Sequence, residues 1–92
     1  MQYGTYKGTD AQFDVSGVIS WDVTITLKED GTYTLTSSNQ DMEKDSNGTY
    51  SITDEYGFIG ILLSNQRIFS VIDNNTLLVP AGSGAEFTYQ GN

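Results

Sequence analysis

The strongest constraint on this chain is the strict alternation of apolar and polar residues in VISWDVTITLK, residues 18–28. From Ile19 to Leu27 every second residue is apolar, and the residues between them are Ser, Asp or Thr. Successive side chains of a β-strand point to opposite faces, so this period of two predicts a strand with one buried face. Trp21 belongs to the apolar set, and we therefore expect its ring to lie in a core.

A short motif, Gly-Thr-Tyr-x-x-Thr, occurs at residues 4–9, 31–36 and 48–53. Gly accepts the positive φ angles of turns, and Thr and Tyr favour strands, so each copy predicts a strand that begins after a turn. On this interpretation 29–31 is a tight hairpin turn and 45–48 is another turn. In the first copy Gly8 stands where the others have Leu or Ile, which predicts a bend or a close backbone approach.

The rest of the chain consists of short apolar runs separated by polar turns, which predict strands at 58–64, 67–73, 76–80 and 85–90. No segment shows convincing helical periodicity. About eight short strands with short connections predict an all-β fold, a small antiparallel meander barrel. We expect one domain, 1–92, whose interior is filled mostly by its own side chains.

The composition limits the chemistry that this chain can perform. It has no Cys and no His, which removes thiolate and imidazole ligands and nucleophiles. Twelve acidic and four basic residues give a formal charge of −8, which argues against nucleic acid and anionic lipid surfaces as partners. No apolar run approaches the roughly 20 residues of a membrane span. We find no nucleophile–base pair, and we expect neither enzymatic activity nor a cofactor.

The stretch GTYKGTDAQFDVSGVISWDVTITLKEDGTYTLTSS resembles the N-terminal domain of NlpE-like bacterial envelope lipoproteins. NGTYSI and RIFSVIDNNTLLV are similar to later parts of the same family, and the resemblance covers most of 4–89. It implies a lipocalin-like barrel in an extracytoplasmic protein, in the cell envelope or secreted, held at the membrane only through a lipid anchor outside this chain. Family members often carry Cys-x-x-Cys in the loop between the first two strands. This chain has TDAQFDVSG there, residues 9–17, so a copper–thiolate site does not carry over.

The leading functional expectation is a non-catalytic binding or sensing module that recognises a protein or an envelope component. An exposed apolar face on 58–63 would favour a protein partner. The alternative is a carrier that holds a small apolar ligand at the barrel mouth. Its cavity would be lined by four aromatic residues: Trp21, Tyr33, Tyr50 and Phe69. If these side chains fill the interior, the carrier hypothesis fails.

A second alternative is a metal-binding module that uses loop carboxylates. EKDSNGTYSITD, residues 43–54, has acids at EF-hand-like offsets, and Asp10 and Asp14 stand in the expected first loop. However, Glu43 and Asp54 occupy positions where an EF-hand has Asp and Glu, and no helix flanks the segment. We therefore expect solvated turns at these places and assign no metal ligand.

Overall fold

The computed structural model describes residues 2–15, 17–55, 57–65, 67–79 and 84–91. In these residues the chain forms eight antiparallel strands, and each strand pairs with the next to close a barrel in the order β1 to β8. The strands are β1 (Gly4–Asp14), β2 (Gly17–Leu27), β3 (Thr32–Ser38), β4 (Glu43–Thr53), β5 (Gly60–Leu63), β6 (Ile68–Asp73), β7 (Thr76–Leu78) and β8 (Glu86–Gly91). This architecture confirms the predicted all-β antiparallel meander barrel.

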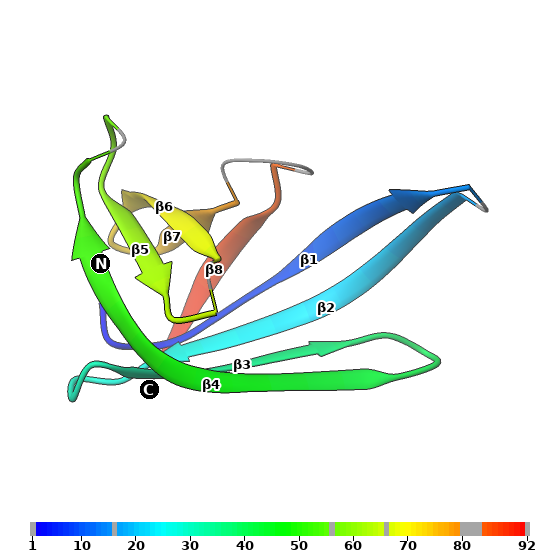
Figure 1. Cartoon of the computed structure of the whole chain (residues 1–92), viewed down its shortest axis with the longest axis horizontal. Coiled ribbons are helices and arrows are strands. Elements are labelled where there is room, and N and C mark those ends of the chain that lie inside the picture. The colour runs from blue at the N-terminus through cyan, green and yellow to red at the C-terminus, as the bar shows by residue number, and fades with distance from the viewer. Residues whose placement is uncertain (1, 16, 56, 66, 80–83, 92) are drawn as a thin grey trace.

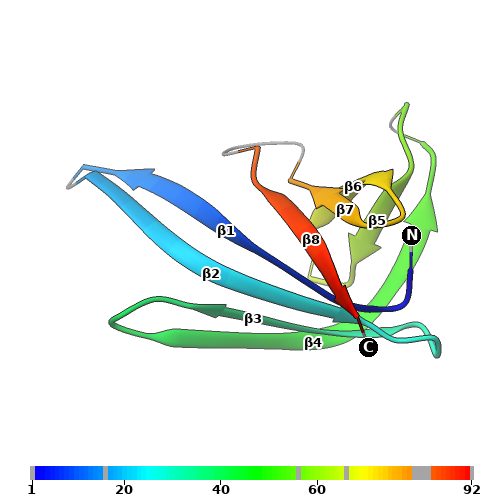
Figure 2. The ribbon, with the colours of Figure 1, turned by 180° about the vertical axis from the view of Figure 1, so that it is seen from behind.

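Two long hairpins, β1–β2 and β3–β4, project to one side beyond the short strands β5–β8 (Figure 1). β1 pairs with β8 only near its start, from Thr5 to Lys7, and β4 pairs with β5 only from Tyr50 to Thr53. Seen from behind, β8 diverges from β1 beyond this contact (Figure 2). All eight strands thus build one half of the molecule, and the hairpins continue alone into the other half. We call this second half, bounded by residues 8–22 and 36–48, the mouth.

The inward-facing side chains of the strands fill the barrel with a single apolar cluster. Its buried members are Tyr6, Trp21, Val23, Ile25, Leu27, Tyr33, Leu35, Ile61, Leu63, Phe69, Leu77 and Phe87. The alternation of 18–28 is confirmed as β2, and the predicted burial of Trp21 is confirmed as well. The rings of Phe69 and Phe87 pack at a tilt, with centroids 5.4 Å apart. Such aromatic pairs add to the stability that apolar burial alone provides.

The predicted turn at 29–31 is confirmed, since Lys28 N donates to the Thr32 carbonyl oxygen at 2.9 Å and Gly31 has a φ of 88°. The turn predicted at 45–48 is wrong, because β4 runs straight through it. The chain instead reverses just before β4, where Asn39 Oδ1 accepts hydrogen bonds from the backbone N–H groups of Asp41 and Met42 at 2.8 and 3.0 Å.

Two further glycines of the Gly-Thr-Tyr copies, Gly8 inside the first and Gly48 at the start of the third, mark close approaches rather than turns. A Cβ at Gly8 would collide with the Phe87 ring and the Glu86 carbonyl oxygen, which confirms the predicted close approach. A Cβ at Gly48 would collide with Ser64 Oγ. A side chain at position 48 would therefore have to displace the Ser64 hydroxyl of the β5–β6 connection, whereas the φ of Gly48 is not positive.

The predicted first loop, 9–17, is also wrong. β1 continues to Asp14 and β2 begins at Gly17, so most of this segment is a paired hairpin. Ala11, Phe13 and Val15 alternate with polar residues over this short stretch only, and the polar residues and Gly17 around them are typical of a loop. The apolar run at 58–64 contains only a short strand, in which Ile61 and Leu63 are buried while Ile59, just before it, is exposed.

The strand predicted at 76–80 is β7, Thr76–Leu78, which begins as expected and ends earlier. The strand predicted at 85–90 is β8, Glu86–Gly91, which is shifted by one residue. Pro80 and the first residues of the turn expected between these strands lie outside the described residues. In the part of the chain that the structure describes, no helix is long and apolar enough to cross a membrane.

Candidate functional site

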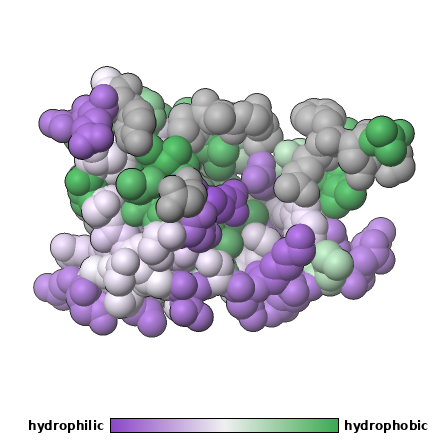
Figure 3. All heavy atoms as spheres, in the orientation of Figure 1, coloured by the Kyte–Doolittle hydropathy of each residue, from purple (hydrophilic) through white to green (hydrophobic). Residues whose placement is uncertain are grey.

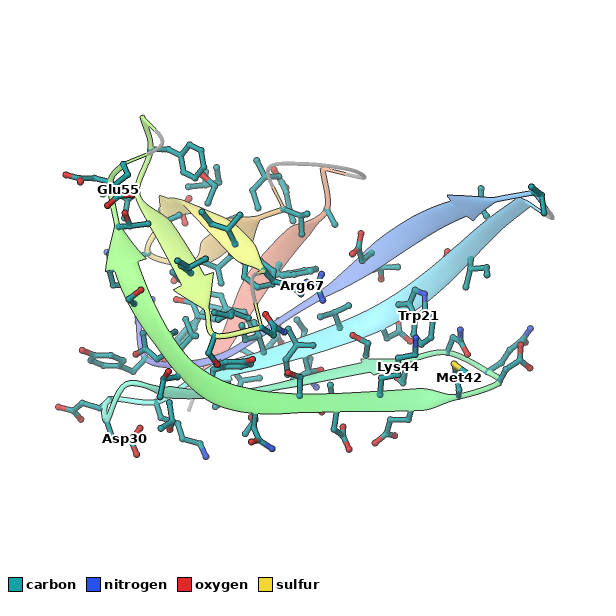
Figure 4. The ribbon with its side chains drawn as sticks, viewed as in Figure 1. Trp21, Asp30, Met42, Lys44, Glu55 and Arg67 are labelled. Carbon is teal, nitrogen blue, oxygen red and sulfur yellow. The ribbon has the colours of Figure 1, made fainter. Side chains whose placement is uncertain are left out.

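The mouth contains a pocket beside Trp21, which we call the Trp21 pocket. Trp21 projects from β2 towards the β3–β4 hairpin, and Lys44 of β4 lies next to it (Figure 4). The strand register explains this arrangement, because Val23 pairs with Ser37 and Ser37 pairs with Lys44, so all three share the inward face. The Trp21 pocket has a volume of about 360 Å³ and is lined by Asp10, Trp21, Val23, Ser37, Lys44 and Arg67.

Two of the four basic residues in this acidic chain meet aromatic rings at the Trp21 pocket. Lys44 Nζ lies 5.0 Å from the centroid of the Trp21 ring, and the guanidinium carbon of Arg67 lies 5.6 Å from that of Phe69. Cations at these distances are attracted by the negative face of the ring. Arg67 Nη2 also lies 3.5 Å from Asp10 Oδ2, so the β5–β6 connection is linked to β1 across the mouth.

A second hollow, the inter-hairpin groove, lies where the two long hairpins separate. Pairing between β2 and β3 runs only from Leu27 to Asp22 on β2, which leaves the tips of the hairpins apart. The groove has a volume of about 440 Å³ and is lined by Val18, Ile19, Ser20, Asp22, Ser38, Asn39, Gln40 and Asp41. Both charged residues of this lining are acidic. In the space-filling view a notch separates the hairpins, and hydrophobic atoms stand at the tip of β1–β2 (Figure 3).

The four aromatic residues predicted to line one cavity do not share a pocket among the described residues: Trp21, Tyr33 and Tyr50 line three different hollows, and Phe69 lines none of these. Trp21, Tyr33 and Phe69 belong to the buried cluster, and Tyr50 is half-buried against it. The Trp21 pocket contains none of the other three. Tyr33 pairs with Leu27, which lies about 20 Å along β2 from Trp21 at the usual rise of about 3.3 Å per residue.

The two buried or half-buried tyrosines have hydrogen-bond partners within the barrel wall. The Tyr33 hydroxyl lies 3.1 Å from Ser46 Oγ, and the Tyr50 hydroxyl donates to the Lys28 carbonyl oxygen at 2.7 Å. Burial raises the pKa of the Tyr50 hydroxyl above its ordinary value. These hydroxyls therefore hold strands together, and the side chains fill the space in which a ligand would otherwise lie.

Sequence analysis did not predict Lys44 and Arg67 at the site. Lys44 stands within the segment that was interpreted as a solvated loop and turn, so its inward direction was hidden. Had β4 been recognised as a strand, its alternation would have placed Lys44 on the same face as Ser46 and Tyr50. The position of Arg67 depends on the conformation of the β5–β6 connection, and no periodic pattern in the sequence predicts it.

Most of the acidic residues considered as metal ligands lie on strands: Glu43 and Asp45 on β4 and Asp10 on β1, whereas Asp54 follows the end of β4. Asp14 ends β1, and its side chain lies outside the described residues. In the described residues, no three acidic side chains come close enough together to hold a metal ion. Glu43 and Asp45 are two residues apart on the extended β4, so their backbone positions lie about 7 Å apart. A metal-binding loop would bring such carboxylates closer together. Asp10 pairs with Arg67.

Comparisons with protein families, curated proteins and solved structures find no match for this chain. The geometry by itself defines the class of protein. In its described residues the chain is an all-β, eight-stranded antiparallel meander barrel, with a mouth between two long hairpins.

Proposed function

We propose that this chain is a non-catalytic binding or sensing module that recognises a protein or an envelope component through its mouth. Of these two kinds of partner, a protein fits the mouth better. The exposure of apolar side chains at the tips of both hairpins carries the proposal. Val15 is fully exposed, and Val18 and Met42 expose 59% and 52% of their surface. Ile52 and Ile59, outside the mouth, are exposed to a similar extent, at 52% and 55%. Val15 and Val18 stand together at the tip of the β1–β2 hairpin, and contiguous exposed apolar side chains with a polar rim are typical of interaction sites.

The setting that we propose is extracytoplasmic, in the cell envelope or secreted, as for NlpE-like lipoproteins. The GTYKGT and TYTLT segments that carry the resemblance form the start of β1 and most of β3. An eight-stranded meander barrel is also compatible with the lipocalin-like fold that the resemblance implies. Attachment to a membrane through a lipid anchor outside this chain belongs to the same proposal.

Site-specific photocrosslinking tests whether the mouth is the binding surface. Met42 in the mouth and Ile72 beside the β6–β7 turn have the same exposed fraction of 52%, so they form a matched pair of positions. A photoreactive residue at Met42 should give a discrete adduct with a protein of the source envelope, and excess unmodified chain should suppress it. The same residue at Ile72 should give none. Equal adducts from both positions, or no adduct from Met42, would contradict the proposal.

A second candidate function is a carrier for a small amphipathic ligand in the Trp21 pocket, a different place from the four-ring cavity expected from the sequence. The pocket is lined by one aromatic ring, one Val and four polar or charged side chains, which suit such a ligand better than a wholly apolar one. The pocket volume of about 360 Å³ favours the carrier, since ligand pockets span about 300–1,000 Å³. Trp21 is the only tryptophan in the chain, so its fluorescence reports on the pocket. A discrete additional mass in native mass spectrometry of the chain from its own envelope, together with a Trp21 emission shift when the ligand is removed, would support the carrier. A bare mass and unchanged emission would contradict it.

A further inference from the structure

The edge of β2 is open in the inter-hairpin groove. Lys28 N donates to the Thr32 carbonyl oxygen, which fixes the direction of the backbone groups along β2. In an antiparallel pair, every second residue directs its N–H and C=O to the same neighbour. Val18 and Ser20 therefore direct these groups to the β3 side, where β3 has already ended at Ser38. In the part of the chain that the structure describes, nothing pairs with them there.

The surroundings of this edge have a defined chemistry. Ser20 and Asp22 are on the outward face of β2, and Ile19 is on the inward face next to Trp21. The carboxylates of Asp22 and Asp41 stand at the two sides of the groove, and its lining contains no basic residue. An open strand edge is a template for pairing with a further strand, and the side chains around it decide which strand fits.

We propose that a partner polypeptide adds an extended segment to this edge of β2, where it pairs with Val18 and Ser20 and places a Lys or Arg beside Asp22 and Asp41. The inference rests on the proposed function and names the binding mode and chemistry of the partner. Strand alternation places the neighbours of the basic residue on the face of Ile19, so these neighbours are apolar. A second copy of the chain is a poor occupant, because it carries the same charge of −8 and the same acidic groove.

Capped peptides of alternating Val and Lys are the probe for this mode. Bound to the full chain, such a peptide should slow amide hydrogen exchange at Val18 and Ser20 about tenfold or more, since both amides gain a hydrogen bond. A matched peptide of alternating Val and Glu should not bind. A third peptide keeps the Val and Lys side chains but is N-methylated along one edge, which removes the ladder hydrogen bonds. It should lose binding about tenfold or more.

Variants of the chain test the same edge from the other side. Ser20→Pro removes an N–H that has no partner among the residues that the structure describes, so the fold should be retained while peptide binding is lost. Ser20→Ala keeps the N–H and should bind like the unchanged chain. Asp41→Asn should weaken binding of the Val–Lys peptide and reduce its dependence on salt, because one opposite charge is removed.

The outcomes separate this inference from the proposed function. Absence of peptide binding, equal binding of the N-methylated peptide, or protection of amides elsewhere would overturn strand addition, while a Met42 adduct would still support binding at the mouth. Should Ser20→Pro fail to fold, the N-methylated peptide still decides. Absence of the Met42 adduct overturns the proposed function itself, whatever the peptides do.

Discussion

Asp22 and Ser38 form the last pair between β2 and β3, and the two long hairpins separate at this point. Within the barrel, Val23 exposes only 2% of its surface, whereas Ile19 in the mouth exposes 37% although it lies on the same inward face. One uninterrupted alternation of apolar residues thus runs from the buried core into the partly exposed mouth. The same strand contributes to the core at one end and to the proposed binding surface at the other.

The close approach at Gly8 predicts a large effect of Gly8→Ala on stability. The new methyl group would meet the Phe87 ring and the Glu86 carbonyl oxygen, and a backbone atom cannot move aside cheaply. We expect the free energy of unfolding to fall by about 1–3 kcal/mol, as for overpacked cores, measured by urea denaturation.

Gly60→Ala is the matched control for this substitution. A Cβ there would lie 3.1 Å from Ile68 Cδ1 and 3.3 Å from Phe58 Cε2, both parts of side chains that can shift. It should cost clearly less than Gly8→Ala. An equal cost at the two positions would mean that β1 and β8 are not in the close contact described.

Truncation of Phe69 should strongly destabilise the barrel. Phe69 is fully buried and packs against Phe87, so Phe69→Ala leaves a cavity in the centre of the core. We expect a loss of about 3–5 kcal/mol in the free energy of unfolding. Ile72→Ala, at an exposed position of the same strand, should cost less than about 1 kcal/mol. A small effect at Phe69 would contradict a filled interior.

The ion pair between Arg67 and Asp10 should contribute little to stability. The Nη2–Oδ2 distance is 3.5 Å and Arg67 is partly exposed, so water screens the attraction. A double-mutant cycle with Asp10→Asn and Arg67→Gln should give a coupling energy below about 1 kcal/mol that decreases with salt. A coupling energy several times larger would contradict this and show that the ion pair contributes substantially to the stability of the mouth.

The β2–β3 turn predicts a specific pH dependence. Hydrogen bonds from the Thr32 hydroxyl at 2.6 Å and the Thr32 N–H at 3.0 Å lower the pKa of the Asp30 carboxyl below its ordinary value. Because the folded-state pKa is lowered, the stability from this group is present above the ordinary pKa of about 3.9 and is lost as the pH falls through the folded value. In NMR titrations Thr32→Val should raise the pKa of Asp30. An unchanged midpoint would show that the hydroxyl is not a donor.

The sequence was informative wherever a strand has one buried face. The alternation that ends at Leu27 predicted β2 and the burial of Trp21, and Gly31 predicted the hairpin turn. β4 was missed because its first half projects into solvent and carries polar residues on both faces. The outer part of β1 was missed because its apolar residues, Ala11 and Phe13, alternate with polar ones over too short a stretch to predict a strand. Segments such as Glu43–Gly48 then resemble loops in composition although their backbone is paired.

The candidate site was harder to predict than the fold. It depends on strand register, which places Lys44 opposite Ser37 and so beside Trp21. Register is set by the packing of whole faces and by the turns, and the turn before β4 was assigned six residues too late, at 45–48 instead of 39–42. The predicted aromatic cavity assumed that four inward rings meet, whereas about 20 Å of β2 separates Trp21 from the level of Tyr33.

Residue-resolved amide hydrogen exchange of the free chain tests whether the edge of β2 is open in the mouth. Ser20 and Thr24 lie on the same strand and direct their N–H groups to the same side. Within the described ranges, Thr24 has a partner there, Thr36, and Ser20 has none. The account predicts that the Thr24 amide is strongly protected while the Ser20 amide exchanges nearly as fast as in an unfolded chain. Comparable protection of the two amides would contradict it, because the ladder between β2 and β3 would then continue past Asp22 and close the edge.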